Sequence, residues 1–555
     1  MNSFDPADYI PQVSGWFSPS IEYVGLGTAK FLNPKGYITG ITTVKYSEQG
    51  ETSIHMEPEL LTLEDHPERT FSVIDIMVFL SGKILAETPF GKAFTYNFSN
   101  PCSSIKVETS EGIFVADKVE NYQPNGLFGE IIEFSVLKAE FRTANSAPAK
   151  YFVMPLYNFL SNEFTWHHEE LLRHPLRIHK APFIEAVLDA QQTYIANYNI
   201  RSKLFICFEH KGKPAFIDKL SDYENLREQL ENKTKQLLIT SVLVGELAAK
   251  RVDLINWEEI IPSYLTYVLS LSSGSMVTTS WIEIRDDEGK LINRIHTNRS
   301  TRKYKKGIAC VDSFVKNGGI AQLLEQAQTS DYLNTYYFRA VIDQIIMAGY
   351  LNDDSNIEDK LSHLFRGLDA ICEKLGSKKK LKPEQYLTPE NKIRFKSLYA
   401  KFIQDLEAII PNNDDEESSL KGVIQQFHKA KVIELGLGKA TLELLKRFNF
   451  PDGEILNAFY MAKTGSNRRY EWANLITTRR GKVIHEAWFD WDNNPPETKE
   501  LISLFYHLHD VMVRILLKSL NYDGEYIPSI FKLRGRSHPI DWVKPDTLAK
   551  QLGYE

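Results

Sequence analysis

The stretch LSHLFRGLDAICEKL, residues 361–375, decides how the second half of the chain is interpreted. Its apolar residues recur at every third or fourth position, the spacing that places side chains on one face of an α-helix. Gly376 and a lysine-rich loop follow it, as is typical of a helix C-terminus. We therefore predict an amphipathic helix with the apolar positions Leu361, Leu364, Phe365, Leu368, Ile371, Cys372 and Leu375.

Similar helical periodicity surrounds this stretch from about residue 311 onward. We expect helices at about 332–351, 390–410, 420–448 and 468–488, and a last one that begins after the prolines at 495 and 496 and reaches Leu520. Pro411 ends the helix at 390–410, and the acidic run 412–419 indicates a solvated linker. The second half of the chain is therefore predicted to be all-helical.

The first half has a different pattern, with short segments rich in β-branched and aromatic residues between Gly, Asn, Pro and Asp turns. Examples are 36–45, 71–79 and 130–137, and a sandwich or barrel-like sheet is expected. Residues 204–217 resemble a hairpin, and 220–247 look mainly helical. The fold class is therefore α+β multidomain. We expect a β-rich domain at 1–155, a mixed α/β continuation or second subdomain at 156–310, and a helical domain at 311–555.

Composition restricts the function classes. The 555 residues carry a formal net charge of -7, so any nucleic-acid site must be a local basic patch. The four cysteines are far apart and form no CxxC pair, which argues against a zinc cluster or a disulfide framework. No signal peptide or long apolar run is evident, so a cytoplasmic protein with no membrane partner is expected.

The segment 479–485, RRGKVIH, contains the side chains for metal-independent RNA cleavage. Such cleavage needs a group that moves the 2′-hydroxyl proton and a cation that stabilises the phosphorane. Because histidine titrates near neutrality, His485 could serve as the general base or acid. Arg480 can bind phosphate oxygens with two hydrogen-bond donors. Five residues of α-helix amount to about 500°, so the two side chains of one straight helix point roughly 140° apart.

Three segments resemble the HEPN superfamily of ribonucleases, in the branch found in ApeA-type bacterial anti-phage proteins. Leu364–Ile371 resembles the family helix in which an acidic residue, here Asp369, follows a leucine. Arg480–His485 resembles the family's arginine-to-histidine motif, and Leu508–Tyr526 resembles its closing helix and tail. The resemblance covers about residues 330–530. The β-rich half is similar to the ApeA N-terminal region only in size, position and character.

The resemblance implies a HEPN-type bundle that cleaves RNA, with tRNA as one candidate, through Arg480 and His485, with Asp369 as an orienting carboxylate. The alternative for Asp369 is a carboxylate on the helix surface that pairs with Arg366 or Arg480. It also implies a homodimer or higher oligomer through the helical domain, and no cofactor. The N-terminal half is expected to restrain the nuclease until a phage-derived trigger is present. Gly481 stands where the family motif usually has a polar residue, and Glu486 stands where it usually has glycine. The alternatives are an inactive HEPN module for RNA binding or dimerisation, and a structural partner protein.

Two further clusters carry side chains that bind phosphate or metal ions. Arg302, Lys303, Lys305 and Lys306 flank a tyrosine, and with Arg479 and Lys482 they are candidates for RNA binding, although a solvated turn is the alternative. The histidine-rich segment 166–179 lacks HExxH spacing and contains Pro175, so no metal site is predicted.

Overall fold

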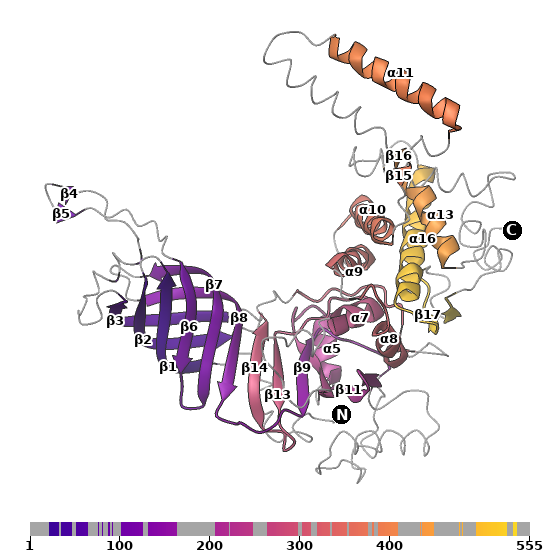
Figure 1. Ribbon diagram of the computed structural model, residues 1–555. Coiled ribbons are helices and arrows are strands. Elements are labelled where there is room, and N and C mark those ends of the chain that lie inside the picture. The colour runs from indigo at the N-terminus through magenta and orange to yellow at the C-terminus, as the bar shows by residue number, and fades with distance from the viewer. Residues whose placement is uncertain are drawn as a thin grey trace, which may run out of the picture.

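The computed structural model describes residues 22–32, 35–46, 52–64, 76, 80, 87–88, 91–92, 101–125, 131–163, 206–220, 223–247, 264–297, 302–311, 319–333, 336–351, 355–375, 380–381, 387–408, 433–434, 436–448, 477, 480, 495–529 and 537–540. Two parts are evident in Figure 1, a long antiparallel sheet and a group of helices at one end of it. The expectation of a β-rich part followed by a helical part is confirmed.

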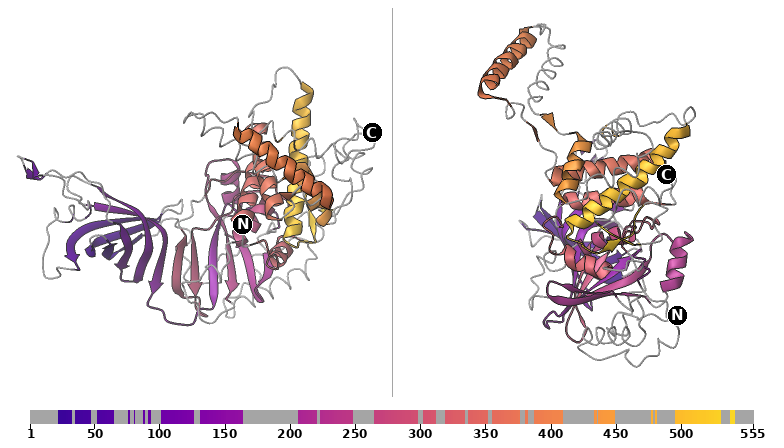
Figure 2. Two further views of the ribbon diagram at one scale, coloured as in Figure 1. Left: turned by 45° about the horizontal axis from the view of Figure 1, so that its top comes forward. Right: turned by 90° about the vertical axis from the view of Figure 1, so that its right-hand side faces the viewer.

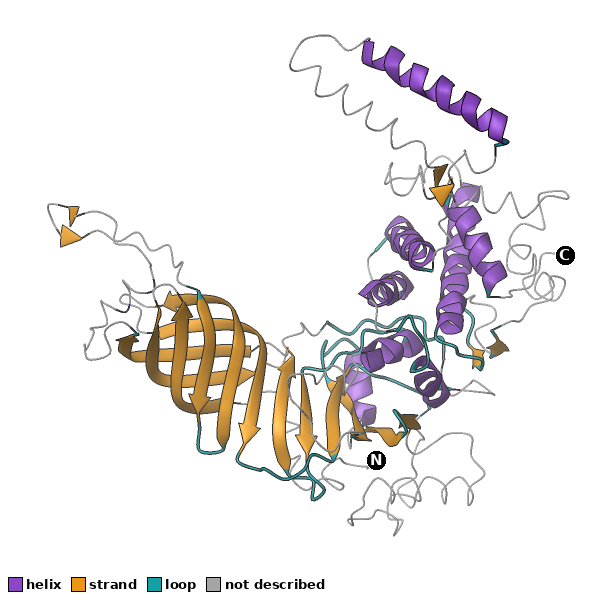
Figure 3. Ribbon diagram, viewed as in Figure 1, coloured by secondary structure: helices purple, strands orange, loops and turns teal. Residues whose placement is uncertain are grey.

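The first strands of the sheet close into a ring (Figure 3). Along the ring, each strand pairs with the next in antiparallel fashion, and the circle is completed because β7 pairs with β8, from Gly112 opposite Thr143 to Asn125 opposite Ile131. The strands in ring order are β1 (Glu22–Leu32), β2 (Lys35–Tyr46), β3 (Thr52–Leu63), β8 (Ile131–Thr143), β7 (Gly112–Asn125) and β6 (Cys102–Glu108).

Alternate side chains fill the ring, because successive residues of a strand point to opposite faces. On β2 the buried positions include Ile38, Thr42 and Val44, with less buried residues between them. Ile76 and Leu80 also belong to this hydrophobic core, and both have helical backbone. The prediction of a strand at 71–79 is therefore wrong at Ile76. Apolar residues four positions apart suit one helix face as well as a strand, which explains the error.

The sheet continues beyond the ring, because β8 also pairs with β14. Among its described members, β9 is buried along its whole length, as expected for a strand covered on both faces. The further strands, in sheet order from β8, are β14 (Leu291–Thr297), β13 (Trp281–Arg285), β9 (Tyr151–Tyr157), β12 (Ile239–Glu246), β11 (Lys213–Lys219) and β10 (Ile206–His210). The predicted hairpin at 204–217 is confirmed by β10 and β11, in which Cys207 lies opposite Phe216.

The expectation of a mainly helical segment at 220–247 is wrong in its second half. Helix α5 (Tyr223–Glu231) is followed by β12, which pairs with β11 on one side and β9 on the other. The sequence ITSVLVGE of β12 is apolar and β-branched, and its burial between two strands outweighs any helical periodicity.

Most of the helices stack above this end of the sheet, and α11 stands apart from them (Figure 1, Figure 2). The stripe predicted for 361–375 is confirmed, because α10 buries it against α9 and α16. Asn356 caps α10 by accepting a hydrogen bond from the amide of Asp359 at 2.8 Å. The described helices of this part are α7 (Tyr264–Ser273), α8 (Ile320–Ala327), α9 (Tyr336–Gly349), α10 (Ile357–Lys374), α11 (Pro389–Ala408), α13 (Leu437–Arg447) and α16 (Pro495–Ser519).

One hydrophobic core joins the second half of the sheet to these helices. It runs from Phe152 and Ile284 in the strands, through Leu269 in α7, to Leu364 and Leu508 in the helices. The ring has its own separate core. Packing therefore unites residues on both sides of position 311. No described helix is both long and apolar enough to cross a membrane.

Candidate functional site

Two of the three residues predicted to be catalytic lie side by side. Nη2 of Arg480 is 3.5 Å from Oδ2 of Asp369, although 111 positions separate the two residues in the chain. Asp369 follows the buried Leu368 on α10, and its side chain is 26% exposed, while that of Arg480 is 35% exposed. This carboxylate and guanidinium therefore form a partly open ion pair at the edge of the helical core. His485, Arg479 and Lys482 lie outside the described residues.

The Arg480 side is anchored to α13. Both Thr477 and Arg480 have helical backbone, and the hydroxyl of Thr477 accepts a hydrogen bond from the amide of Gly438, in the first turn of α13, at 3.4 Å. A β-carbon at Gly436 would lie 3.5 Å from the same hydroxyl oxygen. The hydrogen bond ties Thr477, three positions before Arg480, to the N-terminus of α13.

The Asp369 side is held by the packing of α10. Thr441 of α13 and Cys372 of α10 are in contact, with Sγ and Oγ1 3.7 Å apart. On the opposite side, a β-carbon added at Gly367 would lie 2.7 Å from Cε of Met512 in α16. The contact between Cys372 and Thr441 and the small size of Gly367 let α10, which carries Asp369, pack closely against α13 and α16.

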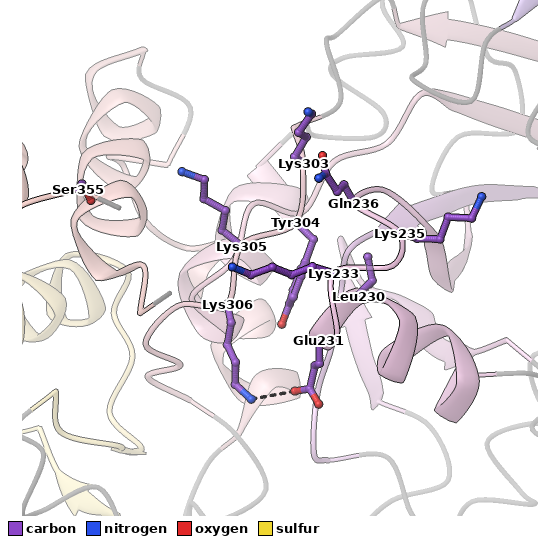
Figure 4. A pocket seen from close by; sticks show the side chains of 10 residues that line it. All are labelled: Leu230, Glu231, Lys233, Lys235, Gln236, Lys303, Tyr304, Lys305, Lys306 and Ser355. Atoms are coloured by element: carbon purple, nitrogen blue, oxygen red, sulfur yellow. Dashed lines mark hydrogen bonds and ion pairs between the residues drawn. The ribbon is translucent and has the colours of Figure 1, made fainter. Parts of the chain in front are cut away.

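The predicted basic run separates into two environments. Arg302 contacts α9, where its Nη2 lies 3.5 Å from Oδ2 of Asp343. Lys303, Lys305 and Lys306 instead line a cavity of about 460 Å³ (Figure 4). The other lining residues are Leu230, Glu231, Lys233, Lys235, Gln236, Tyr304 and Ser355. We call this cavity the lysine pocket.

Sequence reasoning missed Lys233 and Lys235, which come from the turn between α5 and β12. They approach the basic run because the backbone amide of Tyr304 donates to the carbonyl of Gln236 at 2.5 Å. This pairing joins positions nearly 70 residues apart in an irregular segment, and the periodicity of the sequence carries no signal for it.

A buried charge cluster lies at the junction of the ring and the rest of the sheet. Glu283, which is fully buried, accepts from Arg285 at 2.5 Å and from Arg294 at 2.7 Å, and Arg294 also donates to the hydroxyl of Tyr23 at 2.6 Å. Burial by itself raises the pKa of Glu283, but the two guanidiniums outweigh it and hold the pKa below its usual value. The cluster ties β13 and β14 to β1.

The predicted closing helix and tail form another buried polar network. Asp510 accepts from the hydroxyl of Tyr526 at 2.9 Å and from the amide of Ser529 at 2.8 Å, and the hydroxyl of Ser529 lies 2.7 Å from Nδ1 of His509. All four residues are buried. Their role in the structure is to fasten the tail onto α16, and substrate has no access to them.

Comparisons of the chain with protein-family models, with curated proteins and with solved structures find no match. Among the described residues, no group of three or more histidine, cysteine or acidic side chains is placed to hold a metal ion. The histidine-rich segment 166–179 lies outside the described residues.

Proposed function

We propose that the helical part is a HEPN-type bundle that cleaves RNA without a metal ion, as the effector of a cytoplasmic anti-phage protein. The observation that carries the proposal is the 3.5 Å approach of Arg480 to Asp369. The resemblance to the HEPN superfamily implies a role for both residues, and the fold brings them together although they are 111 positions apart in the chain.

The proposed chemistry is transfer of a phosphate ester within the RNA. The 2′-hydroxyl attacks the adjacent phosphorus, the bond to the 5′-oxygen of the next nucleotide breaks, and a 2′,3′-cyclic phosphate and a 5′-hydroxyl result. His485 takes the proton from the 2′-hydroxyl or returns one to the leaving oxygen. Arg480 stabilises the charge that develops on the phosphorane. Asp369 holds Arg480 in position through their ion pair.

Dimerisation is part of the proposal. Arg480 and His485 project roughly 140° apart on a straight helix, so one helix does not direct both at a single phosphate. Two subunits related by a two-fold axis can bring the two motifs into one cleft. The N-terminal half then restrains the nuclease until a phage-derived trigger is present.

The first test compares wild type with His485→Ala and Arg480→Ala on total RNA and on tRNA, with EDTA present. Matched controls are His55→Ala, on the outer surface of the ring, and Arg366→Ala, an exposed arginine on α10. The proposal expects cleavage by wild type and both controls, and its loss in the two site variants. Full cleavage by both site variants refutes it.

A second candidate function rests on Gly481, which replaces the polar residue usual in the family motif. In this alternative the helical part binds RNA or dimerises without catalysis. RNA binding by wild type and by His485→Ala with equal affinity, and no cleavage with or without infecting phage, supports the alternative.

A further inference from the structure

The lysine pocket carries far more positive charge than the rest of the chain. Among the residues that the structure describes, five lysines line it, against one carboxylate, Glu231. Five minus one gives a local formal charge of +4, whereas the whole chain carries -7. Charges of one sign gathered in a concave site raise the local concentration of counter-ions. The pocket is therefore suited to an anion with several charges.

The pocket is formed where three elements meet. Lys306 is tied to α5, because its Nζ lies 2.9 Å from Oε1 of Glu231. Lys305 lies over the ring of Tyr350 at the end of α9, 5.1 Å from the centroid. The carbonyl of Lys306 accepts from the amide of Leu351 at 2.9 Å. These contacts fix the basic run against both the sheet side and the helical side of the pocket.

The turn that supplies Lys233 has a strained backbone. Lys233 adopts a φ of 59°, in the left-handed region that non-glycine residues seldom occupy. Glycine or asparagine would adopt this conformation more readily. Figure 4 shows the side chains of Lys233 and Lys305 extending to the same side of the pocket, while Lys235 and Lys303 extend at its edges. Lys233 lies just past the C-terminus of α5, where a left-handed residue commonly ends a helix, and its amide donates to the carbonyl of Leu230 at 3.1 Å.

The lining indicates what kind of anion fits. Its volume of about 460 Å³ is that of a small-molecule site. Tyr304 is the aromatic residue of the lining, and burial raises the pKa of its hydroxyl. Its ring is partly buried between the lysines and Leu230 and is not displayed as a platform (Figure 4). Proteins that hold single-stranded RNA stack its bases on displayed aromatic rings, so this pocket has the chemistry to recognise phosphates without bases.

We propose that the lysine pocket is a binding site for a compact oligophosphate, a small molecule with two or more adjacent phosphate groups. Lysine ammonium groups bind phosphate as point charges and adapt to its position through their flexible side chains. The shared chemistry is the phosphate chain, whether it belongs to an inorganic polyphosphate or to a nucleoside triphosphate. This proposal is independent of RNA cleavage by the helical part.

Calorimetric titration of the full chain tests the proposal. The probes are inorganic tripolyphosphate, ATP without magnesium, and a single-stranded RNA oligonucleotide with a 5′-hydroxyl. The test variant is Lys303→Gln/Lys305→Gln, which removes two charges. The matched control is Lys45→Gln/Lys106→Gln, which removes two exposed charges from the ring, where Lys45 and Lys106 are 52% and 50% exposed. Circular dichroism checks that both variants are folded.

Tripolyphosphate and ATP are expected to bind wild type and the control variant with equal affinity. Their affinity for the test variant is expected to be lower by about tenfold or more, because charged hydrogen bonds are lost. If wild type binds tripolyphosphate and ATP with equal affinity, the phosphate chain is the ligand. If it binds ATP more tightly than tripolyphosphate, the ligand is a nucleotide. Absence of saturable binding of both compounds, or binding that the test variant retains in full, overturns the proposal. RNA binding that the test variant loses, without tripolyphosphate binding, overturns it in favour of an RNA-binding groove.

Discussion

Replacement of Asp369 by asparagine separates a structural role of this carboxylate from a functional one. The side chains of Asp369 and Arg480 are 26% and 35% exposed, and their charged atoms are 3.5 Å apart. Ion pairs with this degree of solvent access contribute about 0–1 kcal/mol to stability. Because asparagine keeps the size of the side chain, Asp369→Asn is expected to lower the free energy of unfolding by no more than about 1 kcal/mol.

A double-mutant cycle measures this directly. Urea unfolding is followed by circular dichroism for wild type, Asp369→Asn, Arg480→Gln and the double variant, and the coupling energy is the non-additive part. A coupling below about 1 kcal/mol is expected. A coupling of about 3 kcal/mol or more would mean that the pair acts as a buried structural bridge, and would refute the argument from exposure.

The same variants are then assayed for RNA cleavage. If Asp369 positions Arg480 for phosphate, Asp369→Asn is expected to lower the cleavage rate by about tenfold or more, a change in barrier of at least about 1.4 kcal/mol. Asp359→Asn, on the first turn of the same helix, is the matched control and is expected to retain the wild-type rate. A variant that keeps both its stability and its cleavage rate would exclude Asp369 from the site.

Three further outcomes concern the fold. Glu283→Gln is expected to lower the free energy of unfolding by about 3–5 kcal/mol in urea titrations, because the buried Arg285 and the largely buried Arg294 lose their counter-charge. The exposed Glu288→Gln should change it by less than about 0.5 kcal/mol. Burial lowers the pKa of His507 from 6.5 to about 3, so the unfolded chain binds a proton first. Stability should therefore fall as the pH drops from about 6.5 toward 3, by up to about 1.4 kcal/mol per pH unit, and His507→Gln should flatten that slope in urea titrations at several pH values. Gly367→Val places a β-carbon 2.7 Å from Cε of Met512 and should cost about 1–3 kcal/mol by overpacking, measured as a lowered urea midpoint.

Helices of the second half could be predicted from the sequence where their signal is local. The helix predicted at 420–448 is wrong at Ile433–Glu434, which form the short strand β16 paired with β15 (Lys380–Leu381). The stripe of 361–375 follows helical spacing for four turns, and α10 buries that face. The strand predicted at 71–79 is wrong at Ile76, because apolar residues four positions apart fit a helix face as well as a strand. At 239–246, pairing with two neighbouring strands decided the structure, and that information lies elsewhere in the chain.

The candidate site was predictable only in part. The approach of Asp369 to Arg480 followed from a family resemblance, because no periodicity relates two residues on separate helices. Closure of the ring through β7 and β8 depends on strand register, which the sequence does not display. The approach of Lys233 and Lys235 to the basic run was not predictable either, because one backbone hydrogen bond between irregular segments produces it.

The most direct test of the central claim is the chemistry of the RNA ends. Wild-type protein is incubated with tRNA in the presence of EDTA, and mass spectrometry identifies the groups at the termini of any fragments. The proposed roles of Arg480 and His485 require 2′,3′-cyclic phosphates and 5′-hydroxyls, produced by wild type and not by His485→Ala. Fragments that end in 3′-hydroxyls and 5′-phosphates, formed only when a divalent metal is supplied, would contradict it.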